Sequence, residues 1–285
     1  MRILILGSTG LLGTTLSSCL VNYGHDIIRH GNKSQCDVSC DLTNLNDVCV
    51  LLDSLCPDVI INLVALTDVD ACERDMHNAY LLNVKTVENI VTGIKEAHLV
   101  HISTDQVYDE KGLSREENIK LTNIYALTKY AGEIAARLTS STILRTNIFG
   151  NSMLQGRNSF SDWVLDNLHQ KNNITVLEDV VINPLSLESL SRVIACTATK
   201  RIEGVFNVGS HGAMSKADIA FEIAKLFDLP TTKMNRGLVS DMSFVAYRPL
   251  DMSMDCSKYE QVFDYKLPNL YDEIQSIKKD KNVNT

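Results

Sequence analysis

A tyrosine and a lysine four positions apart, Tyr125 and Lys129, are the two residues of this chain whose spacing best suits chemistry. Residues four apart lie on one face of a helix, so the phenol and the ammonium can point at the same spot. A phenol titrates near pH ~10, and a neighbouring cation would stabilise its anion, which would make Tyr125 a proton donor and acceptor at neutral pH. The pattern alone also fits a phenol at the edge of a core beside a solvated lysine, so the catalytic interpretation depends on other parts of the chain.

Three glycines spaced G-x-x-G-x-x-G, Gly7, Gly10 and Gly13, follow a continuous apolar run at residues 2–6. Such a run is typical of a strand buried on both faces, and a helical pattern follows the glycines. Glycines at a strand-to-helix turn let the backbone approach a pyrophosphate, and the helix N-terminus supplies N–H donors. We therefore predict a dinucleotide site at this turn, the alternative being a glycine turn without a ligand.

The second predicted strand, at residues 26–29, ends in the basic residues Arg29 and His30. Sites specific for NAD usually carry an acid at this position, which binds the ribose hydroxyls. The acid of this strand, Asp26, lies at its start instead. Arg29 would suit the 2′-phosphate of NADPH, so we predict NADPH as the favoured cofactor; the alternative is that Arg29 is only solvated.

The order of the predicted elements indicates an α/β protein. Strands and helices alternate from residue 2 to residue 145, which predicts a doubly wound parallel sheet. Beyond about residue 150 the alternation loosens, without an internal repeat or a linker rich in proline and glycine. We predict a dinucleotide-binding domain over 1–150 and a smaller mixed α/β substrate lobe over 151–285. Strands are expected at 2–6, 26–29, 57–62, 98–103, 142–145, 174–177 and 204–208, with helices after the glycines and at 44–55, 77–96, around 125–129, and at 159–171, 186–198, 215–227 and 269–277.

The composition of the 285-residue chain argues against several functional classes. A net charge of −8 without a basic stripe is not typical of a nucleic-acid-binding protein. The sequence shows neither a signal peptide nor an apolar stretch of membrane-spanning length, so we expect a cytoplasmic protein that does not insert into a membrane. The eight cysteines are scattered and lack metal-ligand spacing, which predicts reduced thiols and no metal site.

Two further motifs complete the pattern: Ser103-Thr104-Asp105 at the end of a predicted strand, and the stretch 62–70, N-L-V-A-L-T-D-V-D. Together with the glycines and the Tyr125/Lys129 pair, in this order, they make the chain resemble the extended short-chain dehydrogenase/reductases, and within them the dTDP-4-dehydrorhamnose reductases. The resemblance implies a Rossmann-type sheet. Additional matches lie at Asp41-Leu42, Cys72-Glu73, Asn83, Val107-Tyr108, Leu144-Arg-Thr146, Gly150 and Arg248-Pro249.

This resemblance implies an NADPH-dependent reductase of a nucleotide-linked 4-keto-6-deoxy sugar, in deoxysugar and cell-surface polysaccharide biosynthesis, and it allows NADH as a second cofactor and a homodimer as the assembly. It implies that Thr104 hydrogen-bonds the keto oxygen, that Tyr125 protonates this oxygen as hydride arrives, and that Lys129 lowers the tyrosine pKa and holds the nicotinamide ribose. A structural role for Thr104, capping the turn after its strand, is compatible with this. The implied cofactor residues are Gly7, Thr9, Gly10, Leu11, Leu12, Gly13, Arg29, Asp41, Leu42, Val64, Ala65, Asn83, Tyr125 and Lys129, and the implied substrate residues are Thr67, Val69, Thr104, Asp105, Asn147 and Arg248.

Two classes of relatives remain as alternatives. Sugar-nucleotide dehydratases resemble Thr-Asp-Glu at positions 104–106, but here Gln106 replaces the carboxylate base, which disfavours dehydration. Epimerases of the same superfamily share the Tyr/Lys pair, and the regulatory subunit of methionine adenosyltransferase shares the fold without catalysing a reaction. The chain also departs from the rhamnose-forming pattern, with Asn147-Ile148 in place of Ser-Trp and Met252 in place of serine, so the nucleotide and the sugar stay open.

Overall fold

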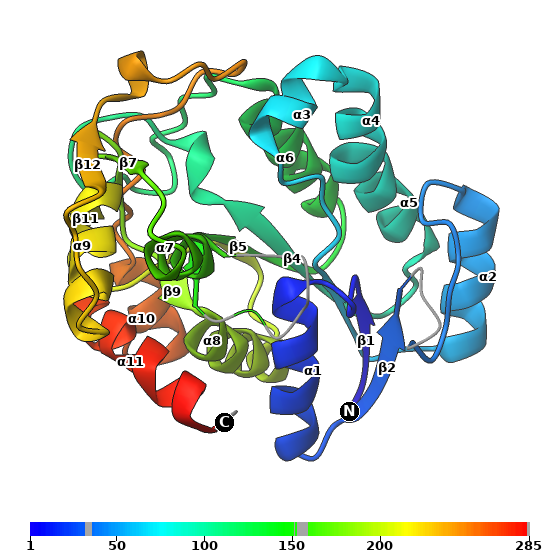
Figure 1. Cartoon of the computed structure of the whole chain (residues 1–285). Helices are drawn as coiled ribbons and strands as arrows, with labels where there is room; N and C mark the ends of the chain where they lie inside the picture. The colour runs from blue at the N-terminus through cyan, green and yellow to red at the C-terminus, as the bar shows by residue number, and fades with distance from the viewer. Residues whose placement is uncertain (32–35, 151, 153–158, 284–285) are drawn as a thin grey trace.

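A six-stranded parallel sheet forms the centre of the computed structural model, which describes residues 1–31, 36–150, 152 and 159–283 (Figure 1). The strand order is β10-β5-β4-β3-β1-β2, and all neighbouring strands are parallel. From β1 the chain adds β2 on one side and then β3, β4, β5 and β10 on the other, as in doubly wound folds. The predicted Rossmann-type fold is therefore confirmed. The strands are β1 (Arg2–Leu6), β2 (Asp26–His30), β3 (Val59–Asn62), β4 (His98–Thr104), β5 (Ser141–Thr146) and β10 (Gly204–Val208).

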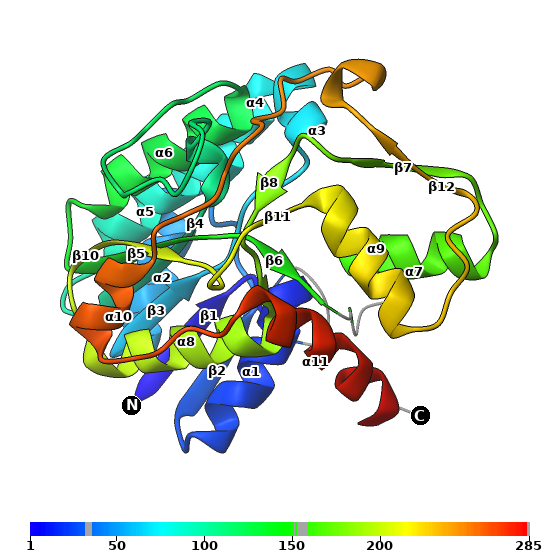
Figure 2. The same ribbon diagram turned by 90° about the vertical axis from the view of Figure 1, so that its left-hand side faces the viewer.

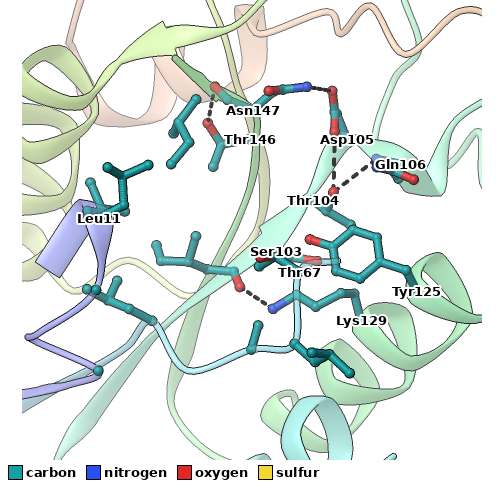
Figure 3. A pocket seen from close by; sticks show the side chains of 18 of the residues that line it. Leu11, Thr67, Ser103, Thr104, Asp105, Gln106, Tyr125, Lys129, Thr146 and Asn147 are labelled. Atoms are coloured by element: carbon teal, nitrogen blue, oxygen red, sulfur yellow. Dashed lines mark hydrogen bonds between the residues drawn. The ribbon is translucent and has the colours of Figure 1, made fainter. Parts of the chain in front are cut away.

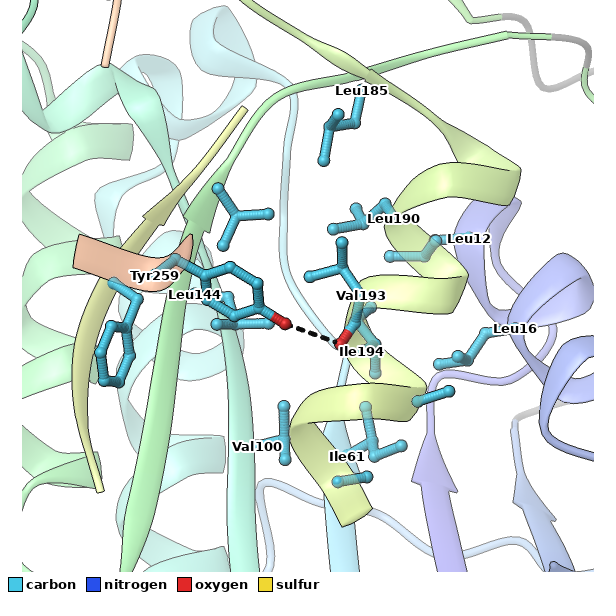
Figure 4. Close-up of a cluster of buried hydrophobic side chains, with 14 of the residues drawn as sticks. Leu12, Leu16, Ile61, Val100, Leu144, Leu185, Leu190, Val193, Ile194 and Tyr259 are labelled. Carbon is cyan, nitrogen blue, oxygen red and sulfur yellow. Dashed lines mark hydrogen bonds between the residues drawn. The ribbon is translucent and has the colours of Figure 1, made fainter. Parts of the chain in front are cut away.

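Both faces of this sheet are covered by helices, because the strands are apolar on both sides. In β1, Ile3 and Ile5 belong to one hydrophobic cluster, whereas Leu4 and Leu6 belong to another. The first cluster joins the sheet to α1 (Leu11–Asn22) and α8 (Leu187–Lys200), which pack together (Figure 4). The second joins it to α2 (Leu45–Leu55), α5 (Thr86–Gly93) and α6 (Ile124–Ala136).

The helix predicted at 77–96 is interrupted in the structure. It consists of α4 (Met76–Tyr80), one π-helical turn η1 (Leu81–Lys85) and α5. A further short helix, α3 (Val69–Arg74), lies outside the helices that the sequence predicts. Its N-cap, Asp68, accepts a hydrogen bond from the backbone N–H of Ala71, which stabilises this start.

The second half of the chain builds a smaller lobe with its own apolar core (Figure 2). Strand β10 and helix α8 nevertheless pack with the large sheet, so the boundary near residue 150 stays a prediction. The elements of this half include α7 (Phe160–His169), β7 (Ile174–Leu177), α9 (Lys216–Leu226), β12 (Met234–Gly237), α10 (Ser257–Phe263) and α11 (Leu270–Val283). Short elements connect them: β6 (Ile148–Phe149), β8 (Val181–Ile182), β9 (Leu185–Ser186), β11 (Met214–Ser215) and η3 (Val239–Asp241).

Within the described residues, no helix is both long and apolar enough to cross a bilayer.

Candidate active site

A cavity of about 630 Å³ opens at the carboxyl ends of the central strands (Figure 3), which is where ligands bind in doubly wound sheets. It brings the glycine turn after β1 together with the ends of β4 and β5 and the start of α6. Twelve of the predicted site residues line it: Gly7, Gly10, Leu11, Leu12, Gly13, Ala65, Thr67, Thr104, Asp105, Tyr125, Lys129 and Asn147.

The glycine turn has the geometry that a bound pyrophosphate needs. Gly7 has a φ of +82°, in the left-handed region. A Cβ at Gly13 would lie 2.5 Å from the Gly7 carbonyl oxygen, so a larger residue there would push the helix off the strand. Helix α1 begins at Leu11, and its N-cap residue, Gly10, has no side chain that could bond the first backbone N–H groups. These N–H groups are therefore available to an anion in the cavity that this turn lines.

Tyr125 and Lys129 lie on the buried side of α6, one turn apart. Asn123 begins this helix, and its side chain accepts a hydrogen bond from the backbone N–H of Ala126 at 2.7 Å. The Tyr125 hydroxyl points toward Thr104 at the end of β4 (Figure 3). Lys129 donates from Nζ to the backbone carbonyl of Ile102 at 2.7 Å, which directs the ammonium along the cavity wall.

The ionisation of this pair differs from the sequence-based expectation. Burial raises the pKa of Tyr125 above its ordinary value, and the charge of Asp105 raises it further, against the hydrogen bond with Thr104. Lys129 is itself buried, and burial lowers its pKa to about 8. The expected lowering of the Tyr125 pKa by Lys129 is therefore not found in the protein alone, because desolvation dominates at both residues.

The last residue of β4, Thr104, and the two that follow it form the other wall. The Thr104 hydroxyl accepts a hydrogen bond from the backbone N–H of Gln106 and donates to Asp105, each at 3.2 Å, so it also caps the short helix η2 (Asp105–Val107). Asp105 accepts a bond of 2.5 Å from the Asn147 amide. Burial raises the pKa of Asp105 to about 6, against the hydrogen bond of Asn147 and the charge of Lys216.

Several other predicted residues lie outside the cavity lining. Asn83, in the π-helical turn, accepts from the Leu66 backbone N–H at 2.8 Å and donates to Thr128 at 3.0 Å, which ties the loop after β3 to α6. Arg248 forms an ion pair with Asp70 at 2.8 Å. Four more have mainly local contacts: Asp41 accepts from Thr43, Leu42 and Val69 are buried in apolar clusters, and the Val64 backbone N–H donates to Asn62.

Arg29 and Thr9 lie outside the residues that line the cavity, and Arg29 has a partner that the sequence analysis overlooked. Its guanidinium donates two hydrogen bonds to Asp37, at 3.0 and 2.9 Å, and its backbone N–H donates a third. Asp26 instead pairs with Arg2 at the other end of the strand. An acid therefore lies at the carboxyl end of β2 after all, contributed by the segment that follows the strand.

A buried ion pair behind the cavity was also missed. Glu133 and Arg145 are both almost fully buried, and they form two hydrogen bonds of 2.8 and 2.7 Å. Ser103 donates to the same carboxylate at 2.6 Å. Two signals in the sequence could have indicated the pair: Glu133 follows Lys129 by one helical turn, and Arg145 interrupts a buried strand, where a charge needs a partner.

Comparisons with known proteins find relatives over nearly the full chain. A model of the RmlD substrate binding domain family matches residues 1–282. A dTDP-4-dehydrorhamnose reductase of Salmonella typhimurium is 30% identical over 292 residues, with 94% of each chain covered. The probable low-salt glycan biosynthesis reductase Agl14 of Haloferax volcanii is 26% identical over 290 residues, covering 96% of each. The crystal structure of a dTDP-4-dehydrorhamnose reductase from Bacillus anthracis, in complex with NADP, has a TM-score of 0.89 at 24% identity and covers 98% of this chain and 99% of that chain.

Proposed function

Since the chain belongs to the RmlD substrate binding domain family, we propose that it reduces a nucleotide-linked 4-keto-6-deoxy sugar with NADPH, in the biosynthesis of a cell-surface glycan. One observation carries the proposal. The hydroxyls of Thr104 and Tyr125 face each other in the cavity that the glycine turn also lines. A dinucleotide on that turn and a ketone at the two hydroxyls would therefore share one cavity.

The glycine turn fits the dinucleotide because its backbone is exposed to the cavity and because α1 begins there. Bound NADPH would supply the hydride. Lys129 uses one of its three N–H donors on the Ile102 carbonyl, which leaves two for the ribose hydroxyls of the nicotinamide. The cofactor assignments of the other residues on this wall are part of the proposal.

Reducing a ketone places negative charge on its oxygen. Thr104 and Tyr125 would each donate a hydrogen bond to this oxygen, which stabilises the charge as it forms. The raised pKa of Tyr125 keeps the phenol protonated at neutral pH, so it can transfer its proton to the new alkoxide. The charged Lys129 at its side would then favour the phenolate that remains.

Gln106 separates this function from dehydration. Its side-chain oxygen accepts a hydrogen bond from Asn123 at 3.2 Å, so the amide holds the start of α6. A dehydratase needs a carboxylate base at this position, and the uncharged amide cannot serve. We therefore do not expect the chain to form its own 4-keto substrate from a hexose.

A panel of sugar nucleotides tests the proposed reaction. We expect NADPH to be oxidised when a 4-keto-6-deoxy sugar linked to dTDP, UDP or GDP is added, and to stay reduced with the parent hexoses. Absorbance at the NADPH band measures this directly. Formation of a 4-keto product from a hexose, or interconversion of two sugars without net oxidation of NADPH, would point to a dehydratase or an epimerase instead. Binding of NADPH without any turnover would favour a regulatory subunit.

Cofactor preference gives a second test, which concerns the Arg29–Asp37 pair. Asp37→Asn removes the charge that neutralises the guanidinium, so we expect the affinity for NADPH to rise several-fold relative to NADH, on the scale of about 1 kcal/mol for an exposed pair. Arg29→Ala should weaken NADPH more than NADH, because only NADPH carries the 2′-phosphate. Calorimetric titration of both cofactors measures the ratio.

The matched control is Asp26→Asn, at the opposite end of the same strand, where the acid pairs with Arg2. It should leave the ratio of the two affinities unchanged. If Arg29→Ala weakens NADPH and NADH equally, Arg29 does not bind the 2′-phosphate.

Three further predictions belong to the proposal and rest on the sequence: division of the chain near residue 150, location in the cytoplasm, and assembly as a homodimer.

A further inference from the structure

Asp105 is a buried carboxylate in the active-site cavity, and the proposed reduction gives it no proton to transfer. It lines the cavity next to Thr104 and is 2% exposed. Of the described residues that line this cavity, Asp68 is the other carboxylate, and it is exposed to solvent and caps α3. A desolvated carboxylate beside a reaction centre is suited to acid–base chemistry, so Asp105 has the position of a general base.

Two uncharged donors hold this carboxylate in one orientation. The Asn147 amide donates to Oδ2 at 2.5 Å, and the Thr104 hydroxyl donates to Oδ1 at 3.2 Å (Figure 3). Burial raises the pKa of Asp105 to about 6, against these hydrogen bonds and the charge of Lys216. At neutral pH the group is therefore mostly ionised, and it is a stronger base than an exposed aspartate.

Binding of a ketone would change the Thr104 end of this arrangement. The hydroxyl has a single proton, and the proposed function has it donate this proton to the keto oxygen instead of to Asp105. Oδ1 then loses its donor while Asn147 still holds Oδ2. In the free protein Oδ1 lies 3.2 Å from the hydroxyl oxygen that would bind the ketone, and the carbons that flank the keto carbon come next in the sugar. A basic oxygen is therefore left beside C–H bonds that the ketone makes acidic.

We propose that Asp105 removes a proton from a carbon that flanks the keto carbon, so that the protein exchanges this proton with water in addition to reducing the ketone. This inference rests on the proposed function, which places the keto oxygen at Thr104 and Tyr125. In the step the C–H bond breaks, its proton moves to Oδ1, and its electron pair forms the C=C bond of an enolate, whose negative charge lies on the former keto oxygen. The hydroxyls of Thr104 and Tyr125 stabilise this charge as they do in the reduction.

The reverse step returns a proton to the same carbon, and it consumes neither an oxidant nor a reductant. Because Asp105 lines the cavity, the carboxylic acid that forms can exchange its proton with water before it is returned. Ketosteroid isomerase combines an aspartate base with hydrogen-bond donors at the oxygen for the same kind of step. Since one carboxylate removes and returns the proton, we expect the carbon to keep its configuration, which separates this exchange from epimerisation.

Deuterium uptake in the presence of NADP⁺ tests the inference, because the oxidised cofactor cannot reduce the ketone. The probes are 4-keto-6-deoxyglucose linked to dTDP or UDP and 4-keto-6-deoxymannose linked to GDP, all in D₂O, and a sample without protein gives the background exchange. Proton NMR follows the two positions that flank the keto group, and mass spectrometry counts the deuterium.

Two variants identify the base. Asp105→Asn removes it and keeps the size of the side chain, and the NADP⁺ affinity of the variant reports that it is folded. The matched control is Asp68→Asn, which removes the other carboxylate of the cavity lining and keeps the cap of α3, since asparagine caps helices as well as aspartate does.

We expect the parent to take up one deuterium at one flanking position faster than the background, and Asp105→Asn to lose this uptake by about 10²-fold or more, as is usual when a general base is removed. Asp68→Asn should exchange like the parent. The inference is wrong if the parent shows only the background exchange, or if Asp105→Asn keeps the uptake. NADPH oxidation by the same parent sample with the same sugar would then show that the proposed function stands without it, whereas absence of both reactions would remove the proposed function as well.

Discussion

Replacing Tyr125 by Phe is expected to lower turnover of a 4-keto sugar nucleotide by about 10²- to 10⁴-fold, which is the usual contribution of a general acid. The ring keeps its place in the apolar cluster with Val69, Cys72 and Ala246, so the fold should not change. NADPH affinity should stay within a factor of about two, since the glycine turn and Lys129 are untouched. Single-turnover oxidation of NADPH, paired with a fluorescence titration of the cofactor, separates the two effects.

Tyr130 offers a control on the same helix. Its ring lies 5.9 Å from the Arg145 guanidinium and does not line the cavity, so Tyr130→Phe should turn over like the parent. If Tyr125→Phe also turned over like the parent, Tyr125 would be a structural phenol and the proposed mechanism would be wrong.

The largest effect on stability is expected at the buried Glu133–Arg145 pair. Glu133→Gln leaves the Arg145 guanidinium without its counter-charge at a position that is 1% exposed. Removing one partner of a buried ion pair typically costs about 3–5 kcal/mol of unfolding free energy, because the other charge stays buried. Urea unfolding of the parent and the variant measures this difference.

The control is Glu188→Gln, which breaks an exposed pair with Arg192 on α8 and should cost less than about 1 kcal/mol. The double variant Glu133→Met/Arg145→Met should recover most of the stability, because it removes both charges together. Equal losses for Glu133→Gln and Glu188→Gln would show that the buried pair does not stabilise the fold. The pair also affects the site, since Glu133 joins the helix of Lys129 to the ends of β4 and β5.

The parts of the site that local signals determine could be predicted from the sequence. The run at 2–6 followed by Gly7 and Gly13 indicates a buried strand, a left-handed turn and a close approach of the helix, all within a few residues. The spacing of Tyr125 and Lys129 gives their common face once a helix is assumed. The strand before Thr104 places this residue at the carboxyl edge of a parallel sheet, where the cavity lies.

Contacts between distant segments could not be predicted in the same way. Asp37 bonds to Arg29 because the backbone that carries Asp37 lies beside β2. Arg145 bonds to Glu133 only when β5 and α6 are packed together. Desolvation is the other missing part: the sequence suggested a tyrosine with a lowered pKa, whereas burial, which depends on the whole fold, raises it.

The most direct test of the central claim follows a labelled hydride. NADPH carrying deuterium at the transferable C4 position is mixed with a 4-keto-6-deoxy sugar nucleotide and the protein in a single turnover, and the product sugar is examined by mass spectrometry and NMR. The account predicts one deuterium on C4 of the sugar, formed by the parent and nearly absent with Tyr125→Phe over the same time. A parent protein that binds the labelled NADPH but transfers no deuterium to any dTDP-, UDP- or GDP-linked keto sugar would contradict it.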